Sequence, residues 1–129
     1  MQYFYIIFFG GLGAMSRYGI NLLLSSDGFP FHTLLVNILG CFLLALAIEY
    51  LSAIPKIPHQ LVSGLGTGFL GAFTTFSAFS AENAHLLLEG SYTIAALYII
   101  SSLIGGFFSA GLGFLFCRKW LQRGNEAED

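Results

Sequence analysis

The stretch GLGTGFLGAFTTFSAFSAE, from Gly64 to Glu82, is apolar and long enough to cross a membrane, yet many of its residues weaken a helix. Its first half contains four glycines, at positions 64, 66, 68 and 71. Each glycine weakens a helix by roughly 1 kcal/mol relative to alanine. Its second half contains Thr74, Thr75 and Ser77, whose hydroxyls compete for the hydrogen bonds of the backbone. The stretch therefore predicts a transmembrane helix that is interrupted partway.

An interruption inside the membrane has a chemical consequence, because lipid offers no hydrogen-bond partner to the freed backbone groups. Irregular backbone at this depth is tolerated only where protein buries it, or where a water-filled cavity or an ion satisfies it. We therefore expect a polar site at the interruption.

The composition of the chain indicates an all-α membrane protein. It has 129 residues, 56% of them hydrophobic and 9% charged, whereas about 25% are charged in an ordinary soluble domain. Since a spanning helix needs about 20 residues, the chain has room for four spans, which we expect at about residues 3–24, 31–51, 60–88 and 92–117. They form one domain, residues 1–118, followed by a polar tail, residues 119–129. The basic residues and Trp120 at its start are expected at the membrane interface, and its end is expected to be solvated and disordered. Nucleic-acid binding has no support, because a basic patch is missing.

The basic residues of the chain indicate an orientation. In a four-span topology, Lys56, Arg118, Lys119 and Arg123 lie on the same side as both termini. Cytoplasmic segments carry an excess of Lys and Arg. This count therefore favours a cytoplasmic position for both termini.

Two strongly polar side chains fall inside the first two spans. Arg17 should face the bundle interior or reach the headgroups, because an ionised group is costly in lipid. Asn37 lies near the middle of the second span. It can hydrogen-bond to another helix, or it can line the path of a solute. Both interpretations of both residues stay open.

An aromatic pair follows the predicted interruption. Phe76 and Phe79 are three residues apart, so on a helix they share one face, and Thr75 and Ser77 flank Phe76. Such a row usually packs in a core. Alternatively, the positive edges of the rings can face an anion, with hydroxyls as hydrogen-bond donors. Glu82 closes the stretch and is expected to meet water or a basic partner.

The fourth span carries small and hydroxyl-bearing residues at helical spacing. Tyr98 and Ser102 are four residues apart and present two hydroxyls on one face. Gly105, Ser109 and Gly113 form an adjoining row that suits close helix packing. For Tyr98 and Ser102, helix packing and a polar path are both open.

Taken together, these residues resemble those of small bacterial fluoride channels of the Fluc or CrcB type. The resemblance covers essentially the whole chain. It depends on three segments in order: GGLGAMSRY at residues 10–18, TLLVNILGCF at residues 33–42 and GFLGAFTTFSAFSAE at residues 68–82. It implies a passive channel that exports fluoride across the plasma membrane and reduces fluoride toxicity. It also implies an antiparallel, dual-topology homodimer, which the charge count does not indicate.

The resemblance assigns roles to individual residues. It implies a fluoride pathway formed by Asn37, Phe76, Phe79, Ser77, Thr75, Tyr98 and Ser102. It implies that the backbone carbonyls of Gly71 and Thr74 bind a central sodium ion that is not transported, since hard oxygen ligands suit a hard cation. Arg17 matches an arginine of the family's first span, with a structural or electrostatic role.

Other classes of function stay open at this point. A proton-coupled small multidrug transporter is also a four-span dimer, but it needs an ionisable carboxylate well inside a span. Glu49 and Glu82 lie near the span ends. A structural subunit of a larger membrane complex would need only helix faces of small residues. We predict that the chain is not an enzyme, because no nucleophile with a base and an orienting group is visible.

Overall fold

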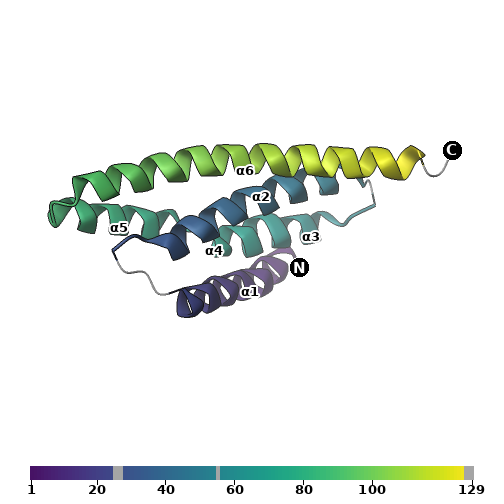
Figure 1. The fold of residues 1–129 in the computed structure, drawn as a ribbon. Coiled ribbons are helices and arrows are strands. Elements are labelled where there is room, and N and C mark those ends of the chain that lie inside the picture. The colour runs from purple at the N-terminus through teal and green to yellow at the C-terminus, as the bar shows by residue number, and fades with distance from the viewer. Residues whose placement is uncertain (25–27, 55, 127–129) are drawn as a thin grey trace.

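The structure, a computed structural model, describes residues 1–24, 28–54 and 56–126, and their regular secondary structure is helical throughout. The helical segments are α1 (Gln2–Leu23), α2 (Phe31–Ala53), α3 (His59–Ser63), η1 (Gly64–Leu70), α4 (Gly71–Phe73), α5 (Phe76–Leu88) and α6 (Tyr92–Glu126) (Figure 1). Four stretches are long and apolar enough to cross a membrane: Gln2–Leu23, Phe31–Leu51, His59–Leu88 and Tyr92–Arg123. The prediction of an all-α protein with four spans is confirmed.

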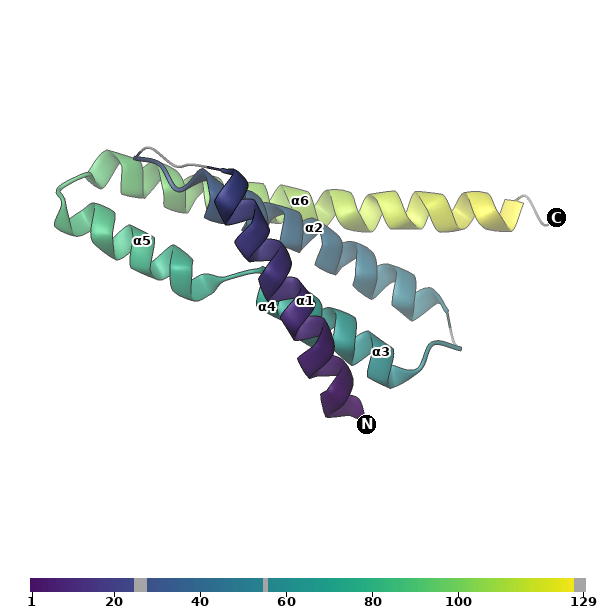
Figure 2. The ribbon, with the colours of Figure 1, turned by 90° about the horizontal axis from the view of Figure 1, so that it is seen from below.

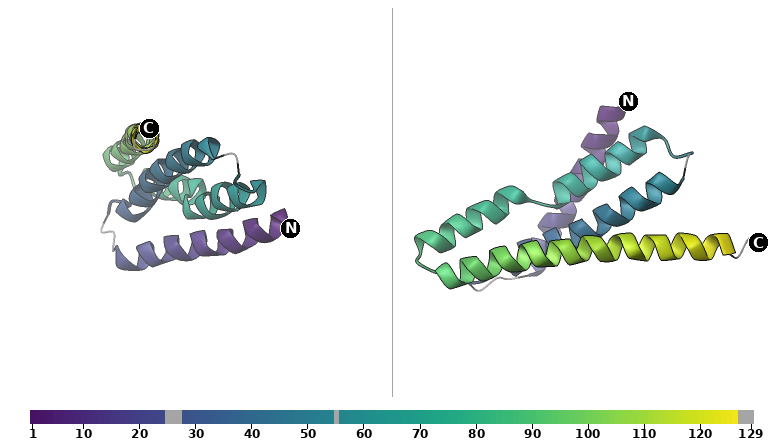
Figure 3. Two further views of the ribbon diagram at one scale, coloured as in Figure 1. Left: turned by 90° about the vertical axis from the view of Figure 1, so that its right-hand side faces the viewer. Right: turned by 90° about the horizontal axis from the view of Figure 1, so that it is seen from above.

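The helices form three layers. Figure 1 shows α6 along one side, α2 and the interrupted helix (α3 to α5) in the middle, and α1 on the opposite side. Seen from below, α1 crosses the interrupted helix obliquely (Figure 2). The end-on view in Figure 3 shows the same order, with α2 and the interrupted helix between α6 and α1. The interruption between α4 and α5 therefore lies inside the bundle.

Small residues bring α6 close to α2. A Cβ atom at Gly105 would overlap the side chain of Ile38, and one at Gly113 would overlap the carbonyl oxygen of Phe42. Between them, the Ser109 hydroxyl donates a hydrogen bond to the Ile38 carbonyl oxygen at 2.7 Å. The predicted packing role of this row is confirmed, because any larger side chain would separate the two helices.

The glycine-rich half of the third span stays helical. Residues Gly64–Leu70 form η1, a π-helical segment that packs against α1. A Cβ atom at Gly13 would overlap the carbonyl of Phe69, and one at Gly68 would overlap the backbone of Ile6. The glycines therefore permit close packing of α1 on η1, and the interruption follows them in the sequence.

The interruption itself is two residues long. The helix ends at Phe73, and both Thr74 (φ −76°, ψ 156°) and Thr75 (φ −148°, ψ 116°) have extended backbone. The Thr75 hydroxyl then accepts a hydrogen bond from the Ala78 amide at 3.1 Å and caps the N-terminus of α5. The prediction of a broken third helix is confirmed, with the break at Thr74 and Thr75.

The fourth span continues as a helix beyond its predicted end. α6 has 35 residues and runs to Glu126, so the end of the tail, which was expected to be disordered, is helical as far as Glu126. Two contacts with α2 support this extension: Arg118 Nε lies 2.6 Å from Glu49 Oε1, and the rings of Tyr50 and Trp120 are 5.8 Å apart. Residues 127–129 lie outside the described residues.

The close approach of α1 to η1 can be tested with the substitution Gly13→Ala. The added methyl group would meet the Phe69 carbonyl, so we expect a loss of about 1–3 kcal/mol of stability, the range for overpacking. Thermal unfolding in detergent, followed by size-exclusion chromatography, measures the loss. Gly11→Ala is the matched control, because a Cβ atom there has no described neighbour within 4 Å. Equal stability of the two variants would contradict the packing.

Candidate functional site

Asn37 of α2 holds the interruption in place. Its side-chain Nδ2 donates to the carbonyl oxygen of Thr75 at 3.0 Å, and its Oδ1 accepts from the Thr75 amide at 2.8 Å. The side-chain amide thus satisfies both backbone groups of a residue that has left the helix. Of the two interpretations of Asn37 that the sequence allowed, the structure shows the hydrogen bond to another helix. One N–H of the Asn37 side chain is not used in this pair, since a side-chain amide has two.

The interruption also removes the usual donors from two carbonyl oxygens. In a continuous α-helix, the amide of Thr75 would donate to Gly71 and the amide of Ala78 would donate to Thr74. Instead, the Thr75 amide donates to Asn37 Oδ1 and the Ala78 amide donates to Thr75 Oγ1. The carbonyls of Gly71 and Thr74 therefore fit the oxygen-donor set that a hard cation takes.

Gly71 and Thr74 both line a cavity at the break. Its volume is about 330 Å³, and it is lined by Asn37, Gly40, Cys41, Leu44, Gly66, Leu70, Gly71, Thr74, Thr75 and Phe76. Among the described residues, no group of three His, Cys, Asp or Glu side chains comes together as a metal site. Cation binding by the carbonyls of Gly71 and Thr74, expected from the sequence analysis, stays a prediction.

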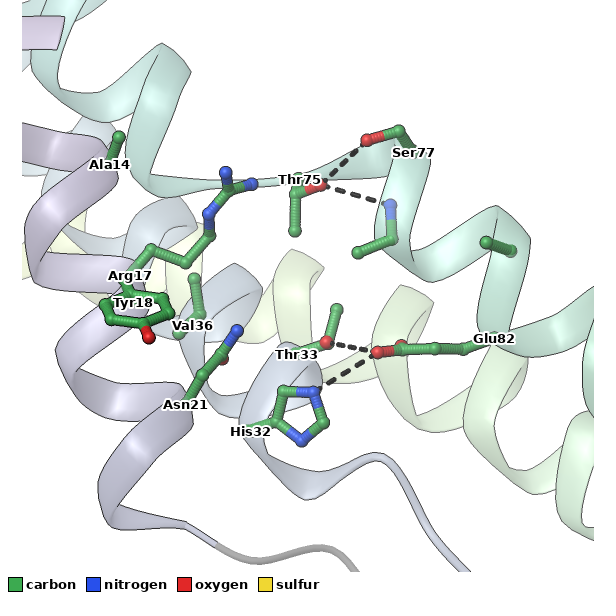
Figure 4. Close-up of a pocket in the computed structure, with 12 residues that line it drawn as sticks. Ala14, Arg17, Tyr18, Asn21, His32, Thr33, Val36, Thr75, Ser77 and Glu82 are labelled. Carbon is green, nitrogen blue, oxygen red and sulfur yellow. Dashed lines mark hydrogen bonds and ion pairs between the residues drawn. The ribbon is translucent and has the colours of Figure 1, made fainter. Parts of the chain in front are cut away.

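A larger cavity opens on the other side of the break, between α1, α2 and α5. Its volume is about 530 Å³, and it is lined by Ala14, Arg17, Tyr18, Asn21, His32, Thr33, Val36, Thr75, Ser77, Ala78, Ala81 and Glu82 (Figure 4). We call it the vestibule. It brings together three of the predicted site residues: Arg17, Thr75 and Ser77.

Arg17 supplies positive charge to the vestibule. Figure 4 shows its guanidinium group extending from α1 toward the break, near Thr75. Within the described ranges, no carboxylate lies within ion-pair distance of Arg17. Arg17 was expected either to face the bundle interior or to reach the lipid headgroups, and the structure favours the bundle interior.

Glu82 is the acceptor of a hydrogen-bond cluster that the sequence analysis did not predict. Thr33 donates to its Oε1 and Tyr98 donates to its Oε2, each at 2.7 Å. His32 Nε2 lies 3.3 Å from Oε1, and the Glu82 side chain is 24% exposed. Glu82 was expected to meet water or a basic partner, and it meets His32 together with two hydroxyls that were not predicted.

One member of this hydrogen-bond cluster, Thr33, could have been predicted from the sequence. Thr33 lies four residues before Asn37 and so shares its face of α2. A second polar residue on the face of Asn37 indicates that this face points to a polar partner. The partner itself cannot be read from the sequence, because Glu82 is 49 residues away from Thr33.

The hydroxyls of Tyr98 and Ser102 donate hydrogen bonds to other groups of the protein. Tyr98 is fully buried, and its hydroxyl donates to Glu82. The Ser102 hydroxyl donates to the Tyr98 carbonyl of its own helix at 2.7 Å. Neither residue lines the vestibule or the cavity beside the carbonyls. Their predicted place on a solute path stays a prediction.

Phe76 and Phe79 share a face of α5, as predicted. Their ring centroids are 5.9 Å apart, and the Phe79 ring also lies 5.1 Å from that of Tyr98. Phe76 is 79% exposed at the start of α5 and lines the same cavity as Gly71 and Thr74. An exposed ring beside this cavity is suited to contact a ligand, lipid or another protein chain.

Four apolar spans, a break in the third and a vestibule lined by charged and hydroxyl-bearing side chains beside that break define a multi-pass membrane protein with an intramembrane polar site. The chain belongs to the family described as CrcB-like protein, Camphor Resistance (CrcB), which matches residues 4–114. The resemblance recognised in the sequence is thereby confirmed.

Several relatives match nearly the full length of the chain. It is 48% identical, over 124 residues that cover 96% of both chains, to a protein of Listeria innocua named fluoride-specific ion channel FluC 2. A Listeria monocytogenes protein of the same name is 44% identical over the same share of both chains. A Bacillus cereus protein named fluoride-specific ion channel FluC 1 is 43% identical over 108 residues, covering 81% of this chain and 75% of the relative.

The role of Asn37 at the break can be tested with Asn37→Ala. The substitution leaves the amide and the carbonyl of Thr75 without their partner, and each unsatisfied buried group costs roughly 1–3 kcal/mol. We expect a lower midpoint of thermal unfolding in detergent. Gln60→Ala, which truncates an exposed amide side chain on α3, is the control. If both variants unfold at the wild-type temperature, Asn37 does not stabilise the break.

Proposed function

We propose that this chain is a channel through which fluoride leaves the cytoplasm passively across the plasma membrane, which lowers fluoride toxicity. The names of the relatives support a fluoride channel, including one 48% identical over 96% of both chains. They are ion channels rather than enzymes, which confirms the prediction that the chain is not an enzyme. The structural observation that carries the proposal is the break at Thr74 and Thr75. At this break, hydroxyl groups and the positively charged Arg17 side chain line a cavity inside an apolar bundle.

The donors around the break suit a small, strongly hydrated anion. Such an anion crosses a membrane only if groups along its path replace the water that it loses. The vestibule offers the Arg17 guanidinium and the hydroxyl pair of Thr75 and Ser77, whose oxygens lie 3.2 Å apart, so that one of the two O–H groups is left to donate. On the other side of the break, Asn37 has a second N–H, and the edge of the Phe76 ring can face an anion. We propose that fluoride passes along these groups.

Phe79, Tyr98 and Ser102 would act mainly as positioning residues of this path. Phe79 packs between the rings of Phe76 and Tyr98. Tyr98 holds Glu82 through its hydroxyl, and Ser102 is bonded to the Tyr98 carbonyl. A carboxylate on an anion path repels the anion, so hydroxyls that fix Glu82 against α2 and α6 keep its charge in one place.

We further propose an antiparallel homodimer with a structural sodium ion at its centre. One chain offers the carbonyls of Gly71 and Thr74, and two copies would offer four oxygens to one cation. Phe76 is 79% exposed close to these carbonyls, and a second copy would cover it. The positive residues favour one orientation, so the antiparallel arrangement depends on the family resemblance.

One observation favours a second function enough to require a test. Glu82 is a partly buried carboxylate, 24% exposed, within the third membrane-crossing stretch, and a proton-coupled exchanger needs an ionisable carboxylate inside a span. In that function Glu82 would bind a proton and a cationic substrate in turn. A structural subunit of a membrane complex would transport neither.

Flux measurements separate the three functions and test Asn37. Purified protein in fluoride-loaded vesicles should release fluoride without a proton gradient. Asn37→Asp should slow this release by at least about tenfold, because it puts a negative charge beside the path, and 1.4 kcal/mol of repulsion is already a factor of ten. Gln60→Glu is the matched control, since it adds the same charge at an exposed position on α3.

Each other outcome points to a different function. Release of a cationic drug that depends on a proton gradient, without fluoride release, would indicate the exchanger. Absence of both activities would indicate the structural subunit. Equal fluoride release from wild type and Asn37→Asp would remove Asn37 from the path.

The sodium ion and the dimer can be tested together. Purified protein is dialysed into sodium, potassium or N-methylglucamine at one ionic strength, and chemical crosslinking measures the fraction of dimer. We expect sodium to raise both the dimer fraction and the midpoint of thermal unfolding, because a ligand that binds the folded state stabilises it. Identical behaviour in the three cations would count against a sodium ion between the carbonyls of Gly71 and Thr74.

A further inference from the structure

An apolar cavity lies between α2 and α6, away from the break. Its volume is about 340 Å³, and it is lined by Leu46, Tyr50, Phe116, Cys117 and Trp120. None of these residues lines the vestibule or the cavity at Gly71 and Thr74. The cavity is therefore separate from the proposed fluoride path.

The cavity lies near the ends of two membrane-crossing stretches. The second stretch ends at Leu51 and the fourth at Arg123, so Tyr50 and Trp120 are close to these ends. Their ring centroids are 5.8 Å apart. Tyr and Trp are enriched at the boundary between lipid tails and headgroups, because each has an apolar ring and one polar group. The cavity therefore begins at headgroup depth.

From there the cavity extends into the apolar part of the membrane. Leu46 and Phe116 lie four residues, or about 6 Å, deeper along their helices than Tyr50 and Trp120. The Phe116 side chain is 61% exposed and that of Trp120 is 58% exposed, so the cavity opens to the outside of the bundle. It offers an apolar site to an acyl chain that runs inward from headgroup depth.

Basic side chains stand next to the cavity on α6. Lys119 follows Phe116 by three residues and Arg123 follows Trp120 by three, so each shares a helix face with a residue that lines the cavity. Three residues advance the helix by about 4.5 Å, here toward the end of the span. Figure 2 shows that α6 extends beyond the end of α2, so α2 does not cover the last turns of α6.

Two of these positive charges have no acidic partner in the described part of the chain. Arg118 is paired with Glu49, its Nε lying 2.6 Å from Oε1. Neither Lys119 nor Arg123 belongs to an ion pair among the described residues. Two cations thus stand about one helical turn from an apolar cavity, toward the headgroups. Basic residues in this position attract anionic lipids.

We propose that the cavity between α2 and α6 binds an anionic phospholipid, with one acyl chain against Phe116 and Trp120 and the phosphate against Lys119 and Arg123. A zwitterionic lipid would fill the apolar part equally well, but its headgroup brings no net charge to the two cations. A second copy of the chain would have to bring an acidic side chain to the same depth. This site does not depend on the proposed channel function, because the groups of the fluoride path do not line it.

The fluorescence of Trp120 tests the proposal without a label, because Trp120 is the single tryptophan of the chain. The protein is reconstituted into vesicles of phosphatidylglycerol and phosphatidylcholine in which one of the two lipids carries brominated acyl chains, which quench tryptophan at short range. From the quenching at several mole fractions we expect phosphatidylglycerol to bind about ten times more tightly than phosphatidylcholine, through its contact with two basic residues. High salt should reduce this preference.

Single charge substitutions test the headgroup contact. Lys119→Gln and Arg123→Gln each remove one of the two cations, so each should lower the preference to about threefold. Lys56→Gln is the matched control, because it removes one positive charge from an exposed position that does not line the cavity. It should keep the wild-type preference. Size-exclusion chromatography verifies that each variant is folded before reconstitution.

Three outcomes would overturn the proposal. Equal quenching by the two brominated lipids would show that the cavity does not select an anionic headgroup. An equal loss of preference in Lys56→Gln and Lys119→Gln would assign the preference to the net charge of the chain. Weak quenching by both lipids, with a smaller crosslinked dimer fraction for Phe116→Ala than for wild type, would show that a second copy covers the cavity.

Discussion

The hydrogen-bond pair between Asn37 and Thr75 is the interaction on which the rest of the structure depends. Inside a membrane, each backbone amide and carbonyl that leaves a helix needs a partner from the protein. Asn37 provides both partners for Thr75, at 3.0 and 2.8 Å. Because this pair exists, the third span can break at mid-bundle, and the carbonyls of Gly71 and Thr74 lose their helical donors without exposing Thr75 to lipid.

The glycines and the break have separate physical roles in one segment. Gly13 and Gly68 let α1 approach η1 so closely that a single methyl group would overlap backbone atoms. This contact fixes the first half of the interrupted helix. The second half is fixed by Glu82, which joins α5 to α2 through Thr33 and to α6 through Tyr98. Each half is thus held by a different partner, and the two extended residues connect them.

The electrostatics of the vestibule follow from this arrangement. The break brings Thr75 and Ser77 opposite Arg17, while the packing of α5 brings Glu82 to the same cavity. The bundle therefore contains a positive and a negative group at a site with hydroxyl donors. In the proposed channel, a carboxylate beside the path would repel an anion unless it is held and its charge is balanced. His32, Thr33 and Tyr98 all contact Glu82 and hold it in one place.

The sequence by itself determined the four spans, the existence of a break and the family, because hydropathy, helix-weakening residues and ordered motifs are local properties of the chain. It also singled out Arg17, Asn37 and Thr75, since polar groups in apolar spans need a partner. Only the tertiary structure decided that Asn37 bonds to Thr75, that Glu82 is enclosed by α2 and α6, and that α6 continues along Glu49 and Tyr50. The reason is that these contacts join residues far apart in the chain, and their partners are chosen by helix packing, which no local pattern records.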